Sequence, residues 1–542
     1  MSLSRRSFLG SAAAGALALP HPGRAANVPG DVVGKITVGY QGWFACVGDA
    51  APIHGWWHWS QDWGRVPSPT NAALIAWPDV REFASTYQTG YANLGNGAPA
   101  TLFSSYDQAT VDTHFAWMLQ NGCDTAALQR FDPNGGEGAT RDAMAQKVRA
   151  AAEKTGRKFY IMYDVSGWAA MQPEIKADWA DKMSALTASA AYARQGGKPV
   201  VGIWGFGFAD DNHPWTAAAC LDVVGWFKAQ GCYVMGGVPT YWRTGVNDSR
   251  AGYIDVYHAF DMLSPWMVGR IGDAAGSDWF HDNVNVGDQA DCDARGIAYQ
   301  PCVLPGDLSR RQRAHGDFMW RQFYNMVRVG AQGLYISMFD EFNEGNQIAK
   351  TAETAAFLPG NSGMLALDED GTRCSADYYL RLTADGGRML KGQIALTAAR
   401  PTPPVAGGGV PGQVISLRAH ADKCYVTAEN AGAAPLVANR TAIGAWEQFD
   451  LLDAGGGNVA LRAHANGRLV CAENAGASAL IANRDAIGPW ETFRIVTNPT
   501  GSVSLQALVN GRYVTTGKAG TTPLVASRPA IGKAEQFDLI VG

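Results

Sequence analysis

The stretch at residues 336–350, I-S-M-F-D-E-F-N-E-G-N-Q-I-A-K, decides the fold and the chemistry that we expect of this chain. Its first residues are apolar and predict a buried strand that ends near Phe339. Three carboxylates, Asp340, Glu341 and Glu344, follow within five residues on an expected loop. Close carboxylates repel one another, so one tends to stay protonated while another stays ionised. Such a pair supplies the acid and the base that cleavage of a glycosidic bond needs.

Residues 341–348, E-F-N-E-G-N-Q-I, resemble the N-E-W-H-E-G-T-Q-I-E run of the glycoside hydrolase family 99 and 71 group. That group comprises endo-acting α-mannosidases and α-1,3-glucanases. The resemblance implies that Glu344 is the general acid and base at the leaving oxygen. It also implies that Glu341 assists attack by the substrate's own 2-hydroxyl, through an epoxide-like intermediate in a retaining reaction.

The motif departs from the family pattern at three positions. Asp340 stands in place of Asn, and Phe342-Asn343 replace Trp-His, which affects the substrate more than the reaction class. Asp340 and Asn343 are expected to contact the substrate. A conventional two-carboxylate mechanism that uses Asp164 or Asp340 stays open. The alternative without chemistry is an acidic surface turn after a strand.

Short apolar runs alternate with helix-period stretches between residues 36 and 390, a pattern that predicts strands separated by covering helices. Eight strands are expected, the number that a parallel barrel needs: 36–44, 125–131, 158–165, 199–208, 232–238, 262–268, 297–304 and 333–339. We therefore predict an α/β domain, a (β/α)8 TIM barrel, over residues 27–398. Active sites in that fold lie at the carboxyl ends of the strands, where the acidic turn falls.

Side chains at the other strand ends are further candidates for the substrate site. Asp164 ends the third strand and is a candidate catalytic or binding carboxylate, and Arg130 could orient a carboxylate or a sugar hydroxyl. The remaining candidates for substrate contact at strand ends are Tyr40, Gln41, Tyr163, Trp204, Trp242, Trp266 and Gln300. Each of them could instead pack against a loop.

An aromatic insertion, H-G-W-W-H-W-S-Q-D-W, occupies residues 54–63 after the first strand. Its Trp56, Trp57, His58 and Trp59 are candidates for stacking on a sugar face, because indole rings suit that contact. The stretch also resembles the W-x-H-W loop of the same hydrolase group. The alternative is a loop folded back as a hydrophobic plug.

The last third of the chain repeats itself three times after residues 399–412, which form a Pro- and Gly-rich linker by composition. Matching positions recur every 44 residues, as at Leu417, Leu461 and Leu505 or at Phe449, Phe493 and Phe537. Three short-strand units, each too small for its own core, predict an all-β β-trefoil over residues 413–542. The sequence of these repeats resembles fascin-like and carbohydrate-binding trefoils.

The three repeats are not equal. The first two copies carry a polar and aromatic set that we predict to bind sugar: Glu429, Asn439, Trp446 and Glu447, then Glu473, Asn483, Trp490 and Glu491. The third copy has Gly517, Ser527 and Ala534 in place of the Glu, Asn and Trp. This loss predicts two working sugar pockets and one lapsed pocket. The alternative is that both Trp residues only seal the base of the trefoil.

The beginning of the chain predicts export. S-R-R-S-F-L-G at residues 4–10, an apolar stretch and a small-residue site near Ala25 predict a twin-arginine signal peptide over residues 1–26. The mature protein is then periplasmic or extracellular, and no later apolar run reaches the roughly 18 residues of a membrane span. Charged residues are 17% of the chain and the net charge is −5 without a basic block, which argues against nucleic acid.

The sequence therefore predicts an exported, monomeric glycoside hydrolase that cleaves an α-linked polysaccharide or glycan of the α-mannan or α-glucan type. The trefoil would hold it on the polymer. No cofactor is expected, and the nine cysteines lack C-x-x-C spacing, so no zinc or other metal is expected either. The alternative is a non-catalytic, lectin-like carbohydrate-binding protein on an inactive barrel.

Overall fold

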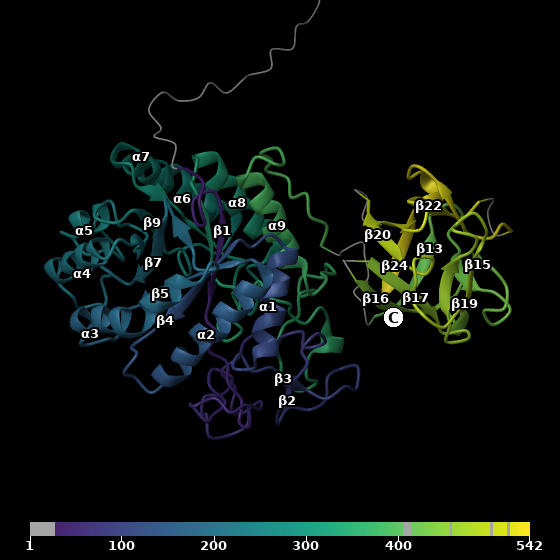
Figure 1. The fold of residues 1–542 in the computed structure, drawn as a ribbon, viewed down its shortest axis with the longest axis horizontal. Coiled ribbons are helices and arrows are strands. Elements are labelled where there is room, and N and C mark those ends of the chain that lie inside the picture. The colour runs from purple at the N-terminus through teal and green to yellow at the C-terminus, as the bar shows by residue number, and fades with distance from the viewer. Residues whose placement is uncertain (1–27, 405–412, 456–457, 499–501, 518–520, 542) are drawn as a thin grey trace, which may run out of the picture.

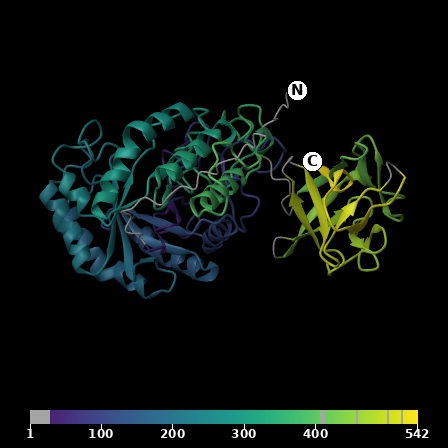
Figure 2. The same ribbon diagram turned by 90° about the horizontal axis from the view of Figure 1, so that it is seen from above.

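The computed structural model describes residues 28–404, 413–455, 458–498, 502–517 and 521–541. The predicted signal peptide and residues 405–412 of the predicted linker lie outside the described residues. The described chain forms an α/β domain up to residue 404 and an all-β domain from residue 413, which we call the repeat domain (Figures 1 and 2).

The α/β domain is built on a parallel sheet whose strands match the eight predicted ones. The order of the strands is β10-β9-β8-β7-β5-β4-β1-β12-β11. Only Gln300 and Pro301 separate β10 from β11, and these two strands lie at opposite ends of the row, so the row returns to its start as in a TIM barrel. The strands are β1 (Ile36–Tyr40), β4 (Thr125–Arg130), β5 (Lys158–Asp164), β7 (Lys198–Trp204), β8 (Tyr233–Val238), β9 (Met262–Pro265), β10 (Ala298–Tyr299), β11 (Cys302–Val303) and β12 (Leu334–Ile336).

Helices follow the strands and cover the sheet (Figure 1). They are α1 (Gln108–Gln120), α2 (Gly138–Thr155), α3 (Met171–Asp178), α4 (Ala217–Ala229), α5 (Ile254–His258), α6 (Ala274–Phe280), α7 (Val286–Arg295), α8 (Asp317–Val329) and α9 (Tyr378–Leu390). Single turns of helix occur at Trp179–Met183, Ser184–Ala188, His281–Asn285, Ala314–Gly316 and Ala355–Phe357. Among the described residues, no helix combines the length and the apolar character needed to cross a membrane.

The inside of the sheet is packed, as expected for parallel strands covered on both faces. All residues of β1 and β4 are buried. A Cβ atom on Gly39 of β1 would lie only 2.4 Å from the hydroxyl of Tyr335 and 2.3 Å from the sulfur of Met338. This close packing leaves little space between the strands near Gly39, and the cavity described below lies at their carboxyl ends. All nine cysteines lie in the described part of the chain, and none is paired with another.

A long insertion, residues 41–107, links β1 to α1 and carries β2 (Tyr87–Gln88) and β3 (Thr101–Leu102). It binds directly to the acidic turn, because the backbone N–H groups of Ile75 and Ala76 donate to the carbonyl of Phe342 at 2.9 and 3.1 Å. A short strand, β6 (Arg194–Gln195), pairs with β7 elsewhere in the domain.

The repeat domain is an antiparallel sheet with its first and last strands paired, β13 with β24, at Leu417 opposite Leu539. In each copy a buried Glu caps a turn: Glu447, Glu491 and Glu535 accept the N–H of Gly444, Gly488 and Gly532 at 2.8, 3.0 and 2.7 Å. Its described strands are β13 (Val414–Ala419), β14 (Tyr425–Ala428), β15 (Leu436–Arg440), β16 (Phe449–Gly455), β17 (Asn458–Ala463), β18 (Leu469–Ala472), β19 (Leu480–Arg484), β20 (Phe493–Thr497), β21 (Val503–Ala507), β22 (Arg512–Thr515), β23 (Val525–Arg528) and β24 (Phe537–Val541).

Candidate active site

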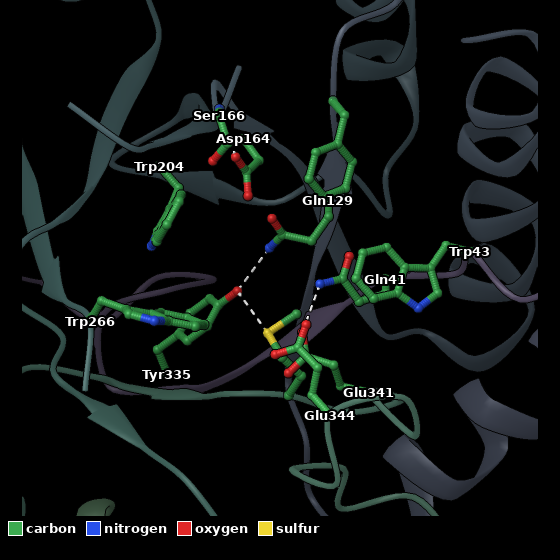
Figure 3. A pocket seen from close by; sticks show the side chains of 12 residues that line it. Gln41, Trp43, Gln129, Asp164, Ser166, Trp204, Trp266, Tyr335, Glu341 and Glu344 are labelled. Carbon is green, nitrogen blue, oxygen red and sulfur yellow. Dashed lines mark hydrogen bonds between the residues drawn. The ribbon is translucent and has the colours of Figure 1, made fainter. Parts of the chain in front are cut away.

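A cavity of about 280 Å³ opens at the carboxyl ends of the parallel strands. Because these ends meet at one mouth, residues from distant parts of the chain share its wall. The lining residues are Gln41, Trp43, Gln129, Phe131, Asp164, Ser166, Trp204, Trp266, Tyr335, Met338, Glu341 and Glu344 (Figure 3).

Three carboxylates face this cavity. Figure 3 shows Glu341 and Glu344 on one side and Asp164 on the opposite side. Glu341 is buried, and one of its oxygens accepts a hydrogen bond of 2.9 Å from Nε2 of Gln41. Its second oxygen has no hydrogen-bond partner among the described residues. Glu344 is exposed at the edge of the cavity, so the pair combines a sheltered carboxyl with an accessible one.

The electrostatics of the cavity favour retention of a proton. Burial, and then the nearby charge of Glu344, raises the pKa of Glu341 well above its usual range. Surrounding protein, followed by the charges of Asp164 and Asp307, raises the pKa of Glu344 as well. Burial also raises the pKa of Asp164. The cluster can therefore hold both a protonated and an ionised carboxyl at a pH where isolated carboxyls are all ionised.

Asp340 lies behind the cavity wall and holds it together. Its two oxygens accept the backbone N–H groups of Gln41 and Gly42, each at 2.8 Å. These bonds fix the start of the insertion, and with it the Gln41 side chain that binds Glu341. Burial raises the pKa of Asp340 to about 6. The structure thus gives Asp340 a positioning role in place of the predicted substrate contact.

The acidic turn itself is anchored by a buried arginine that the sequence reasoning missed. Arg313 donates to the carbonyls of Gly345 and Gln347, both at 2.8 Å. Gly345 adopts a φ of 74°, and a Cβ on it would lie 3.0 Å from the Asp307 carboxylate. Glycine therefore suits both the backbone conformation and the space that this turn requires.

Two residues predicted to contact substrate, Arg130 and Tyr163, are strand neighbours of residues that line the cavity. Neighbouring residues of a strand point to opposite faces, so Gln129 and Asp164 line the cavity while Arg130 and Tyr163 point away from it. Arg130 and Tyr163 both bind the buried Asp178, at 2.6 and 2.8 Å. The alternation of side chains along each strand is the signal that would have selected Gln129.

Other predicted contacts lie in the core, away from the cavity lining. The Tyr40 hydroxyl lies 2.9 Å from Nδ1 of His114, Trp242 donates to Asp288 at 3.0 Å, and Gln300 donates to Thr37 at 3.2 Å. Asn343 is half-buried and does not line the cavity either. Gln41, Asp164, Trp204, Trp266, Glu341 and Glu344 are the predicted residues that do line it.

The aromatic insertion supports the cavity wall from behind. His58 stacks on Trp43 with ring centroids 3.8 Å apart, and burial followed by the charge of Arg141 lowers the pKa of His58 to about 3. Trp56 and Trp59 are buried, and Trp57 contacts Trp63 edge-on. The described geometry matches the hydrophobic-plug alternative, and Trp43, on which His58 of this loop stacks, lines the cavity.

The coupling within the carboxylate pair leads to a titration prediction. Replacing Glu344 with Gln removes a neighbouring negative charge, so we expect the pKa of Glu341 to fall, while burial keeps it above the usual value for Glu. Carbon-13 NMR of the labelled carboxyl groups, followed between pH 4 and pH 9, measures this shift. An unchanged titration of Glu341 in Glu344→Gln would show that the two carboxyls do not interact.

Comparison with protein-family models and with curated protein sequences gave no match. Among solved structures, the chain is similar to the GH99 endo-α-mannosidase from Bacteroides thetaiotaomicron, with 14% identity and a TM-score of 0.49 over 67% of this chain and 98% of that one. It is also similar to the designed threefold-symmetric protein ThreeFoil, with 24% identity and a TM-score of 0.22 over 23% of this chain and 97% of that one. The "BEL beta-trefoil" matches at 12% identity with a TM-score of 0.23, over 25% of this chain and 96% of that one.

Proposed function

We propose that this chain is an exported, monomeric glycoside hydrolase that cleaves an α-linked glycan, with a (β/α)8 barrel as its catalytic domain and a β-trefoil that binds the polymer. The observation that carries the proposal is one cavity with Glu341 and Glu344 on one side and Asp164 on the other. The resemblance of the motif to family 99 supports an α-mannan type of substrate. Export rests on residues 4–26 alone.

The two glutamates divide the work according to their surroundings. Glu344 lies at the open edge, where it can protonate the leaving oxygen and then activate the incoming water. Glu341 is buried and oriented by Gln41, so it suits a fixed hydrogen bond to a sugar hydroxyl. In the retaining reaction that the motif implies, this hydroxyl is the 2-hydroxyl, which attacks the anomeric carbon. A conventional mechanism would use Asp164 as the nucleophile from across the cavity.

Digestion of a panel of α-mannans and α-glucans tests this function. We expect new reducing ends from at least one polymer, and NMR of the first products to show retention of the anomeric configuration. Polymer binding without any release of reducing ends would instead support the lectin-like alternative.

The repeat domain carries two similar polar clusters. In the first copy, Glu429 accepts from Asn439 at 2.6 Å and pairs with Arg440 at 2.9 Å. The second copy repeats this arrangement with Glu473, Asn483 and Arg484, at 2.7 and 2.8 Å. The carbonyl oxygens of both Asn side chains have no partner among the described residues. We propose that these clusters, with Trp446 and Trp490, bind sugar.

Glu447 and Glu491 have a structural role beside these clusters, and Glu491 lies 3.8 Å from Nε of Arg484. Both are buried and cap turns, as does Glu535 of the third copy, so they build the fold. Trp446 is 37% exposed and Trp490 is partly exposed, which leaves part of each ring open to a ligand.

Replacing Trp446 and Trp490 together with Ala is expected to remove most polysaccharide binding, because stacking on a sugar face is lost at both sites. Co-sedimentation of the full-length protein with insoluble polymer measures this effect. Lys533→Ala, next to the Ala534 that replaces Trp in the third copy, is the matched control and should bind normally. Full binding by the double variant would place the contact elsewhere.

A further inference from the structure

Three residues joined by hydrogen bonds, Ser166, His213 and Asp210, lie beside the cavity, and the proposed mechanism does not use them. Oγ of Ser166 lies 3.0 Å from Nε2 of His213, and Nδ1 of His213 lies 2.6 Å from Oδ1 of Asp210. Ser166 lines the cavity, and its backbone N–H donates to Oδ1 of Asp164 at 2.9 Å. This row of hydrogen bonds therefore ends at Ser166, on the cavity wall opposite Glu341 and Glu344 (Figure 3).

The spacing is that of a nucleophile triad, but the surroundings do not suit acyl transfer. Such a site needs free N–H groups for the developing oxyanion. Here the N–H of Ser166 binds Asp164, that of Gly167 binds the carbonyl of Asn212 at 2.9 Å, and that of Trp168 binds the carbonyl of Val165 at 3.1 Å. The Asp164 carboxylate would also repel the negative charge that forms on the intermediate.

We propose instead that Asp210 and His213 fix Ser166 as a hydrogen-bond acceptor, and that Ser166 and Asp164 together recognise two free hydroxyls on one sugar unit. The Asp210 carboxylate can only accept from Nδ1–H, and in that tautomer of the imidazole Nε2 accepts the Ser166 O–H. The Ser166 oxygen and the Asp164 carboxylate, which belong to residues that line the cavity, are then both acceptors there. A wall of acceptors selects a ligand with neighbouring donors, which a sugar diol supplies.

The structure holds His213 firmly in this orientation. Its side chain is buried, and its ring packs against Phe208 and Trp204 at centroid distances of 5.1 and 5.5 Å. Gly205 has a φ of 117°, and a Cβ there would lie 2.8 Å from the His213 ring. The N–H of Asn212 also donates to Asp210, at 2.9 Å. Since Trp204 lines the cavity, the packed unit supports the sugar site directly.

The inference rests on the proposed function, and binding without turnover tests it. Calorimetry uses Glu344→Gln protein with two probes, an α-linked mannotriose and an α-1,3-linked glucotriose. Adding Asp210→Asn removes the negative charge that holds the Nδ1–H tautomer of His213, so Nε2 is no longer fixed as the acceptor of the Ser166 O–H. We expect Asp210→Asn and Ser166→Ala to weaken binding by about 3- to 10-fold. Asp211→Asn, a change at the exposed neighbour, should have no effect.

Monodeoxy analogues of the bound probe separate this role from general structural damage. The Glu344→Gln protein should bind one of these analogues more weakly than the parent sugar. When Ser166→Ala is added, the protein should bind that analogue and the parent sugar equally. Normal binding by Asp210→Asn, or an equal loss with every analogue, would overturn the inference and leave the proposed function standing. Failure of both probes to bind would overturn both proposals. A Ser166-dependent burst with p-nitrophenyl acetate would show an acyl-transfer site instead.

Discussion

Glu344→Gln is expected to lower kcat on the cleaved α-glycan by about 10²–10⁴-fold, the usual contribution of general acid catalysis. The amide keeps the size and shape of the carboxyl but has no proton to give to the leaving oxygen. Glu344 lies exposed at the cavity edge, and its side chain makes no hydrogen bond or ion pair within the described part of the chain, so KM and the unfolding temperature should change little. Initial rates over a range of substrate concentrations measure both constants.

The leaving group offers a sharper version of this experiment. Dinitrophenolate leaves a dinitrophenyl glycoside without needing a proton. The kcat of Glu344→Gln on this substrate should therefore fall far less than its kcat on the natural glycan. Glu153→Gln changes an exposed Glu on α2 and serves as the matched control. Equal losses on both substrates would assign Glu344 another role, and a kcat near that of the unmodified protein would remove it from the mechanism.

The strands of the barrel-like sheet could be predicted because parallel strands are buried on both faces and stand out as apolar runs. The seventh predicted strand is interrupted in the structure. Pro301 follows Gln300 at the break between β10 and β11, and proline has no N–H to donate to a neighbouring strand. A proline within an apolar run is visible in the sequence, so this break could have been expected.

The sequence could place Glu341 and Glu344 near the end of a strand, but it could not show which residues support them. The acidic turn is local in sequence, whereas Gln41, which orients Glu341, is 300 residues away along the chain. Arg313 reaches the turn only because the chain folds back after β11. The residue type also does not reveal the direction of a side chain: Gln129 and Asp164 line the cavity, whereas their neighbours Arg130 and Tyr163 bind Asp178 in the core.

Arg130→Ala is expected to destabilise the protein by about 3–5 kcal/mol, the loss typical of breaking a buried ion pair from one side. Arg130 is 1% exposed, and its Nε and Nη2 atoms lie 2.6 and 2.5 Å from the two oxygens of Asp178. Asp178 is itself buried and accepts from Tyr163. Removing the guanidinium leaves this carboxylate without its counter-charge in the core, where water cannot replace it.

Urea unfolding followed by tryptophan fluorescence measures this loss, and the companion variants identify its cause. Arg149→Ala, a change at a partly exposed residue of α2, should shift the unfolding free energy by less than about 0.5 kcal/mol. Replacing Arg130 with Met and Asp178 with Leu in the same protein should recover much of the stability, because no unpaired charge remains. A variant with unchanged stability but a raised KM would instead place Arg130 at the substrate, against the contacts that the structure shows.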